Sequence, residues 1–234
     1  MVGNKADAVR IQTSFLNAAE KKILVWLAVR QPKWMTSDIL TLIGTAGSLI
    51  AAAGYVLSAR NRSFLWLSSL GFLINWYGDS LDGTLARVRG TQRPIYGFYL
   101  DHNIDGITIA IMCVGAGLST LLNLYIAMAV LAVYLLLSIS VYINAHLKGE
   151  FKLTYAGMGP TEFRLIMIVV NTLFVFIAPL REWNISFALN HMVIRLGALD
   201  IVGLIILIVL VLIYVNNFVH DAEDYAKVDP VKPY

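Results

Sequence analysis

The clearest apolar run of this chain extends from Ile201 to Val215, contains no charged residue and does not alternate between apolar and polar residues. A bilayer core about 30 Å thick needs roughly 20 apolar residues in a helix that crosses it. Six such runs are present, at residues 36–57, 63–86, 98–119, 122–146, 163–180 and 198–219. Only 14% of the 234 residues are charged, too few to cover a water-soluble domain of this size. We therefore predict an all-α integral membrane protein with six transmembrane helices.

The first 33 residues have a different pattern. Their apolar residues recur at helical spacing and their basic residues lie mostly on other faces; the apolar set is Ile11, Phe15, Leu16, Ala19, Ile23, Trp26 and Leu27. This pattern favours an amphipathic helix on the membrane surface over a soluble cap, and its charges argue against a cleavable signal peptide. We expect three parts: a surface helix at 1–33, a six-helix transmembrane domain at 34–221 and a cytoplasmic tail at 222–234.

The basic residues predict an orientation. If the amino terminus is cytoplasmic, fourteen of the eighteen lysines and arginines fall on the cytoplasmic side. The other side receives Arg60, Arg62, Arg181 and Arg195. Because cytoplasmic loops are enriched in basic residues, we expect both termini to be cytoplasmic, in the cell inner membrane if the source is prokaryotic. The one cysteine, Cys113, excludes an intramolecular disulfide.

Four aspartates stand near the ends of two neighbouring predicted spans. On the first helix, residues three and four apart share a face, and that face carries Asp79, Asp82, Gly83, Ala86 and Arg87. The next helix contributes a second stripe, made of Gly97, Asp101 and Asp105. Packing the two stripes together brings four carboxylates around a space that the small residues widen.

Four carboxylates in a medium of low dielectric need a compensating charge. Oxygen ligands without histidine or cysteine favour Mg²⁺, Mn²⁺ or Ca²⁺ over zinc, and two ions about 4 Å apart would clamp a diphosphate. Two plainer explanations remain open at this point. The acids can be solvated at the level of the lipid headgroups, and the small residues can simply allow close helix packing.

The same residues match a known pattern, D-x2-D-G-x2-A-R and, after a gap of nine residues, G-x3-D-x3-D. The stretch from Asp79 to Asp105 therefore resembles the CDP-alcohol phosphotransferase family. The resemblance implies six spans, an amphipathic amino-terminal helix and a homodimer. It also implies a reaction of phospholipid biosynthesis, in which a CDP-linked alcohol gives its phosphoryl-alcohol group to an acceptor hydroxyl and releases CMP.

The resemblance also assigns roles. Asp79, Asp82 and Asp101 would be metal ligands, and Asp105 would share the second metal and act as the general base on the acceptor hydroxyl. The nucleotide-binding residues would be Asp82, Gly83, Ala86, Arg87 and Gly97. A carboxylate base suits the chemistry, because an alcohol is a weak nucleophile until its proton is removed.

The substrates are less constrained by the sequence. The modest length favours a phosphatidyl donor, CDP-diacylglycerol, with a polar alcohol as acceptor. The alternative is CDP-choline or CDP-ethanolamine with diacylglycerol as acceptor, because Asp101-His102 and Asp105 are similar to the D-H-x-x-D of that branch. Candidate residues for the acceptor site are His102, Asn144, His146, Glu162 and Arg164.

Two other classes compete with this interpretation. An intramembrane prenyltransferase also binds Mg-diphosphate but lacks the D-G-x2-A-R core. A divalent-cation transporter would also place carboxylates within the membrane, although the later spans carry no second acidic motif. No nucleic-acid-binding motif is present, so we expect the partners to be the CDP-linked donor, the alcohol acceptor and membrane lipids.

Overall fold

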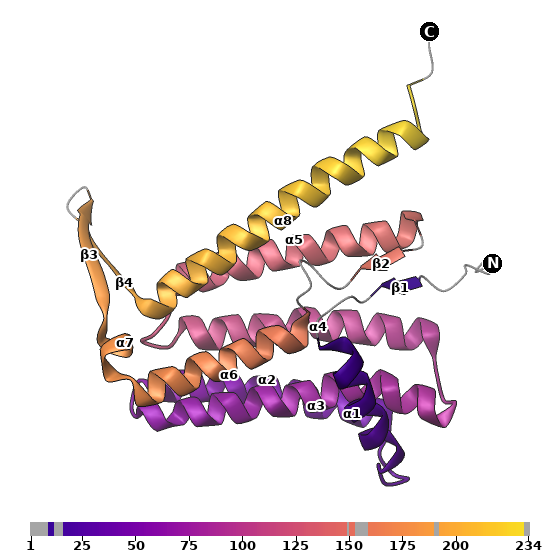
Figure 1. The fold of residues 1–234 in the computed structure, drawn as a ribbon, viewed down its shortest axis with the longest axis horizontal. Coiled ribbons are helices and arrows are strands. Elements are labelled where there is room, and N and C mark those ends of the chain that lie inside the picture. Colours follow the sequence, from indigo (N-terminus) through magenta and orange to yellow (C-terminus); the bar gives the residue numbers. More distant parts are fainter. Residues whose placement is uncertain (1–8, 12–15, 149, 153–158, 190–191, 232–234) are drawn as a thin grey trace.

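The computed structural model describes residues 9–11, 16–148, 150–152, 159–189 and 192–231. Its helices are α1 (Asn17–Val29), α2 (Ser37–Ser58), α3 (Leu65–Arg89), α4 (Pro94–Gly117), α5 (Leu124–Lys148), α6 (Pro160–Phe176), α7 (Ala178–Glu182) and α8 (Ala198–Val228), with a short 3-10 turn, η1 (Arg62–Phe64), before α3. The strands are β1 (Val9–Ile11), β2 (Glu150–Lys152), β3 (Asn184–Leu189) and β4 (Met192–Gly197). Figure 1 shows the long helices α2 to α6 lying side by side.

The six long helices lie at the positions of the six apolar runs. Three of them, α2, α5 and α8, are long and apolar enough to cross a membrane. In α3 and α4 the aspartates lower the hydropathy at one end, and α6 has 17 residues. Helix α8 continues to Val228, into residues that the sequence assigned to the cytoplasmic tail.

The prediction of an all-α fold is wrong in one respect, because two small sheets accompany the helices. Strands β1 and β2 pair in parallel, and β3 and β4 form an antiparallel hairpin. In β3 the residues alternate between polar Asn184 and Ser186 and apolar Ile185 and Phe187, which is the period of a strand. The hairpin follows α7 and projects from one end of the bundle (Figure 1).

The amino-terminal region is helical over less of its length than the sequence predicted. Ile11 lies in β1, Phe15 falls outside the described residues, and α1 begins only at Asn17. Its buried stripe is Glu20, Leu24 and Ala28. The apolar residues Ile23 and Trp26 are instead 50% and 55% exposed. Figure 1 shows α1 crossing the long helices, and its placement on a membrane surface stays a prediction.

Helices α2 and α3 approach each other closely because glycines face one another along their contact. A Cβ atom added to Gly47 would lie 2.8 Å from the Gly71 carbonyl oxygen, and one added to Gly71 would lie 2.6 Å from Ala51 Cα. Further along, a Cβ on Gly78 would lie 2.6 Å from Gly44 Cα. Small residues let helix backbones approach in this way. The pair therefore forms a close-packed base for the aspartates of α3.

Candidate active site

Three of the four aspartates come together. Carboxylate oxygens of Asp79 on α3 and of Asp101 and Asp105 on α4 all lie within 4.8 Å of one another. All three side chains belong to residues of intermediate burial. The two helices are joined by a short loop after Gly90, whose φ of 64° suits glycine and turns the chain back toward the same end of the bundle. We name these three residues the aspartate cluster.

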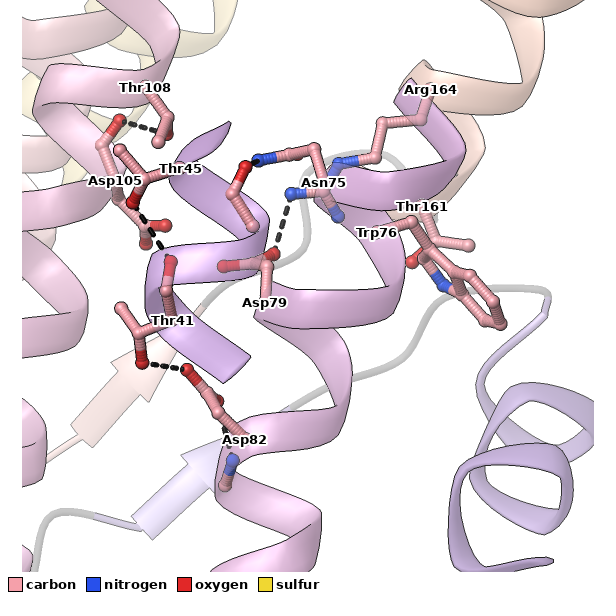
Figure 2. A network of polar contacts seen from close by, with 12 residues as sticks. Thr41, Thr45, Asn75, Trp76, Asp79, Asp82, Asp105, Thr108, Thr161 and Arg164 are labelled. Carbon is pink, nitrogen blue, oxygen red and sulfur yellow. Dashed lines mark hydrogen bonds and ion pairs between the residues drawn. The ribbon is translucent and has the colours of Figure 1, made fainter. Parts of the chain in front are cut away.

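An arginine from a distant part of the chain enters the aspartate cluster. Arg164 Nη2 on α6 lies 2.5 Å from Asp79 Oδ2, and the two side chains are only 12% and 25% exposed. Figure 2 shows this contact between α6 and α3. The second guanidinium nitrogen, Nη1, is buried and has no hydrogen-bond partner among the described residues. One candidate for the acceptor site thus lies directly at the cluster, with a donor available to a further anion.

Asp82 lies one turn further along α3 and engages α2 instead. Its Oδ2 accepts a hydrogen bond of 2.7 Å from Thr41 Oγ1, and its Oδ1 accepts one of 2.5 Å from the Gly83 backbone N–H (Figure 2). The Ser37 hydroxyl donates to the Asp82 carbonyl oxygen at 2.9 Å. Asp82 is therefore outside the group of three, on the same helix and oriented by α2.

Asn75 extends the polar stripe of α3 in the opposite direction from Asp82. It lies one helical turn before Asp79 and is 2% exposed, and its Nδ2 donates to the Gly44 carbonyl at 2.9 Å. The sequence prediction did not include this residue. Its spacing of four from Asp79, within an apolar run, was the signal that would have identified it.

Two of the residues expected to bind the nucleotide, Gly83 and Gly97, have open space around them. A Cβ added to Gly97 would meet no atom within 4 Å, and one added to Gly83 would meet only Arg87 Nη1, at 3.5 Å. Ala86 is half-buried and Arg87 is exposed. Arg87 Nη2 donates to Thr84 Oγ1 at 2.9 Å, which holds the guanidinium along its own helix.

His102 lies between the aspartate cluster and α5. Its ring stacks on Phe98 at 4.0 Å between centroids and lies 5.0 Å from the ring of Tyr142. Its Nδ1 is 3.7 Å from Asp101 Oδ2. This candidate for the acceptor site thus borders the cluster through Asp101.

The other three candidates for the acceptor site have different surroundings. Asn144 on α5 donates to Asp221 at 2.7 Å and accepts from the Tyr225 hydroxyl at 2.7 Å, so it joins α5 to α8. Glu162 accepts from the backbone N–H groups of Gly159, at 2.9 Å, and Leu16, at 3.1 Å, so it holds the start of α6 against the segment before α1. His146 is exposed near the end of α5. The contacts given for Asn144 and Glu162 are therefore with α8 and with the segment before α1.

A second acid supports the position of α6. Glu20 on α1 is buried, and its Oε1 accepts hydrogen bonds from Trp76 Nε1 at 2.8 Å and from Thr161 Oγ1 at 2.6 Å. It thereby connects α1 both to the helix of Asp79 and to the helix of Arg164. Nothing in the local sequence around Glu20 indicated this role, because its partners are 56 and 141 positions away.

The donor set of the aspartate cluster fits a hard divalent cation. Three carboxylate oxygens within 4.8 Å match the oxygen ligands that Mg²⁺ and Mn²⁺ take in proteins, with water and phosphate completing the coordination. Among the described residues this is the one group of three or more acids, histidines or cysteines close enough to share an ion.

Comparison with known proteins identifies the family. The model of the CDP-alcohol phosphatidyltransferase family matches residues 34–211. The chain belongs to this family. Among curated relatives, human cholinephosphotransferase 1 is 26% identical over 159 residues, which are 64% of this chain and 38% of the relative. Mouse cholinephosphotransferase 1 is 30% identical over 104 residues, 42% of this chain and 26% of the relative.

The chain spans well under half the length of the curated relatives that it matches. The family match begins at residue 34 and covers α2 to α7 and the amino-terminal part of α8. The aspartate motif lies inside it. Members of this family are transferases, and the predicted resemblance is confirmed.

Proposed function

We propose that the protein transfers a phosphoryl-alcohol group from a CDP-linked donor to an acceptor hydroxyl and releases CMP. The convergence of Asp79, Asp101 and Asp105 within 4.8 Å carries this proposal. The new bond joins the acceptor oxygen to the phosphorus that bears the alcohol. The bond that breaks joins this phosphorus to the bridging oxygen, which leaves with CMP. Family membership favours this reaction over a divalent-cation transporter.

Asp105 is the proposed general base. It takes the proton from the acceptor hydroxyl as the oxygen–phosphorus bond forms, which such positioned groups accelerate by roughly 10²–10⁴-fold. Asp79, Asp82 and Asp101, with Asp105, would hold Mg²⁺ or Mn²⁺, as two ions; the metal would supply charge neutralisation of the diphosphate. In the structure Asp82 is oriented by Thr41 and lies one helical turn along α3 from Asp79.

Two arginines are suited to the phosphates. Arg164 holds Asp79 with one guanidinium nitrogen, and the buried Nη1 is available for a phosphate oxygen of the bound donor. Arg87 stands beside Gly83, where the absence of a side chain leaves room for the cytidine. Asp82, Ala86 and Gly97 complete the proposed nucleotide site.

Two kinds of CDP-linked donor are candidates for this reaction. CDP-diacylglycerol with a polar alcohol acceptor is the expectation from the sequence. Transfer of phosphocholine or phosphoethanolamine to diacylglycerol is favoured by the names of the curated relatives and by His102, which stacks on Phe98 beside Asp101. A phosphorylated polar acceptor would need additional cations, and Lys148 is already paired with Asp221 and Asp224.

The purified chain, reconstituted in phosphatidylglycerol vesicles with Mg²⁺, is used to test both reactions. Each donor is paired in turn with diacylglycerol, glycerol phosphate, inositol phosphate and serine, and the lipid product is identified by mass spectrometry. CMP formed in step with a new lipid supports the proposal, and the donor consumed selects between the two reactions. Absence of CMP release with every pair, while the chain remains folded, would refute it.

The arrangement in the membrane is part of the proposal. We infer six spans formed by α2 to α6 and α8, with α1 on the membrane surface, both termini cytoplasmic and a homodimer as in the resembled family. Support comes from the basic residues at the connection between α3 and α4: Arg87 and Arg89 lie in the last turn of α3, and Arg93 directly precedes α4. Labelling of single cysteines placed at residues 92 and 184, in a Cys113→Ala background, should report opposite sides of the membrane, and crosslinking in vesicles tests the dimer.

A further inference from the structure

A cavity of about 380 Å³ lies at the end of the bundle opposite the aspartate cluster. Three arginines and one glutamate are its charged lining: Arg60 and Arg62 from the turn between α2 and α3, and Arg181 and Glu182 from α7. Leu65, at the start of α3, belongs to the lining as well. At 1.5 Å per helical residue, Leu65 is about 21 Å along α3 from Asp79. The cavity is therefore separate from the aspartate cluster.

The number of arginines here is unusual for this end of the protein. By the sequence count, only four of eighteen basic residues fall on the side away from the aspartates, and three of these four line one cavity. The fourth, Arg195, lies outside the cavity on β4. Neither Arg60 nor Arg62 makes an ion pair or a side-chain hydrogen bond within the part of the chain that the structure describes.

The turn that carries two of the arginines is fixed, and the side chain of the third is held by its neighbours. Asn61 accepts a hydrogen bond of 2.9 Å from the Ser63 backbone N–H, which fixes the turn that carries Arg60 and Arg62. Arg181 is 19% exposed, and it donates to the Phe174 carbonyl at 3.0 Å and to Glu182 at 3.1 Å. The guanidinium of Arg181 is already positioned, so it loses less entropy when it binds an anion.

Aromatic side chains mark the same end as a membrane–water boundary. Trp66 and Trp183 are 44% and 45% exposed, and Trp66 packs edge-on against Phe176 at 6.0 Å. Tryptophan is enriched at the level of the lipid headgroups. A cavity at this depth has access both to phosphate groups of lipids and to phosphate in solution.

We propose that this cavity is a second ligand site, which binds a phosphate group through Arg60, Arg62 and Arg181. Guanidinium groups bind phosphate with two parallel hydrogen bonds, and the volume suits a headgroup-sized ligand. Two sources carry the same chemistry: the headgroup of an anionic lipid in the leaflet opposite the aspartates, and free phosphate. We name it the arginine pocket.

Binding to the purified full chain in maltoside detergent tests this proposal. Isothermal titration is carried out with inorganic phosphate, with dihexanoyl phosphatidic acid and with phosphate-free dihexanoylglycerol. All titrations contain EDTA, so that metal-dependent binding at the aspartate cluster does not contribute. We expect phosphatidic acid to bind and dihexanoylglycerol not to bind. Phosphate binding as tightly as phosphatidic acid would assign the arginine pocket to the free anion, and weaker phosphate binding would assign it to the lipid.

The double variant Arg60→Gln/Arg62→Gln should weaken binding of the tighter probe at least tenfold. Arg195→Gln, at the same end but outside the pocket, is the matched control and should leave the affinity within twofold. Both changed arginines are exposed, so we expect the double variant to fold. If it cannot be purified, the single variants Arg60→Gln and Arg62→Gln are titrated instead. The proposal is overturned if neither probe binds the unchanged chain, if the variants bind as well as it does, or if Arg195→Gln loses as much.

Discussion

The α2–α3 pair and the α5–α8 pair are built in different ways. Along α2 and α3, facing glycines bring the backbones together, and a Cβ on Gly71 would lie 2.6 Å from Ala51 Cα. Along α5 and α8 the buried residues are few, and polar side chains join the helices near their carboxyl ends, where Lys148 binds Asp221 at 2.8 Å. Helix α4, which carries Asp101 and Asp105, packs closely on α2. A Cβ added to its Gly115 would lie 3.1 Å from the Ala52 carbonyl carbon.

The difference fits the place of the proposed chemistry. Catalytic groups must be held within a fraction of an ångström, and backbones in direct contact leave little freedom for them to move. The α5–α8 pair instead presents long apolar surfaces, with residues such as Ile139 and Leu212 exposed at 51% and 64%. Side chains of this kind suit contact with lipid, where a rigid geometry is not required. Changes in the two regions should therefore have very different effects.

The largest effect is expected at Asp105. Asp105→Asn removes the proposed base, and CMP release should fall by about 10²–10⁴-fold while CMP binding, measured by titration with Mg²⁺ present, stays nearly unchanged. The matched control is Asp224→Asn on α8, which removes a half-exposed carboxylate and should leave turnover within about twofold. Near-normal turnover of Asp105→Asn would exclude Asp105 as the base.

The next effect tests the packing itself. Gly71→Ala forces a Cβ against the backbone of α2 and should lower stability by about 3 kcal/mol, or roughly 6–12 °C in thermal midpoint. Gly203→Ala on α8 is the control, because its Cβ would meet side-chain atoms of Ile126 at 2.9 Å and Leu122 at 3.1 Å. These can shift, so we expect a loss below about 1 kcal/mol. Equal shifts in the two melting curves would remove the distinction between the pairs.

A smaller effect is expected at the contact between Asp82 and α2. Asp82→Ala should raise the Mg²⁺ concentration for half-maximal CMP release about tenfold, and Thr41→Val should raise it a few-fold, since the hydroxyl only orients the carboxylate. Thr45→Val is the control, because the Thr45 hydroxyl bonds to the carbonyl of Thr41 within α2. An unchanged Mg²⁺ dependence in Asp82→Ala would count against Asp82 as a ligand.

Local patterns in the sequence predicted much of this molecule. The long helices follow from apolar runs, and the stripes of Asp79 and of Asp101 with Asp105 follow from helical spacing, because both signals lie within one element. The contact between Asp79 and Arg164 joins positions 85 apart, so nothing near either residue predicted that they meet. The closeness of α2 and α3 had a signal in Gly44 and Gly47, but its partners on α3 were visible only in the fold.

The β3–β4 hairpin and the contacts of Asn144 did not follow from the pattern of apolar runs. The alternation in β3 is short, and it lies between two apolar runs where a connecting loop was expected. The position of Asn144 near the end of its predicted span favours it as an acceptor-site residue. Its amide instead binds Asp221 and Tyr225 of α8, a helix whose extension to Val228 the sequence did not predict. Position along a span predicts depth in the membrane but not the neighbour that a side chain meets.

The smallest effect is expected in the polar contacts of the α5–α8 pair. Lys148→Met removes the ion pairs to Asp221 and Asp224, whose side chains are 23% and 39% exposed. Exposed ion pairs contribute about 0.2–1 kcal/mol, and salt screens them, so the thermal midpoint should fall by no more than about 2–4 °C and turnover should stay within twofold. Raising the salt concentration should reduce the difference in thermal midpoint between Lys148→Met and the unchanged chain. It should not reduce the difference in thermal midpoint that Gly71→Ala produces. If Lys148→Met abolished turnover at low and high salt alike, the α5–α8 contact would belong to the reaction site, and the contrast between the two pairs would be lost.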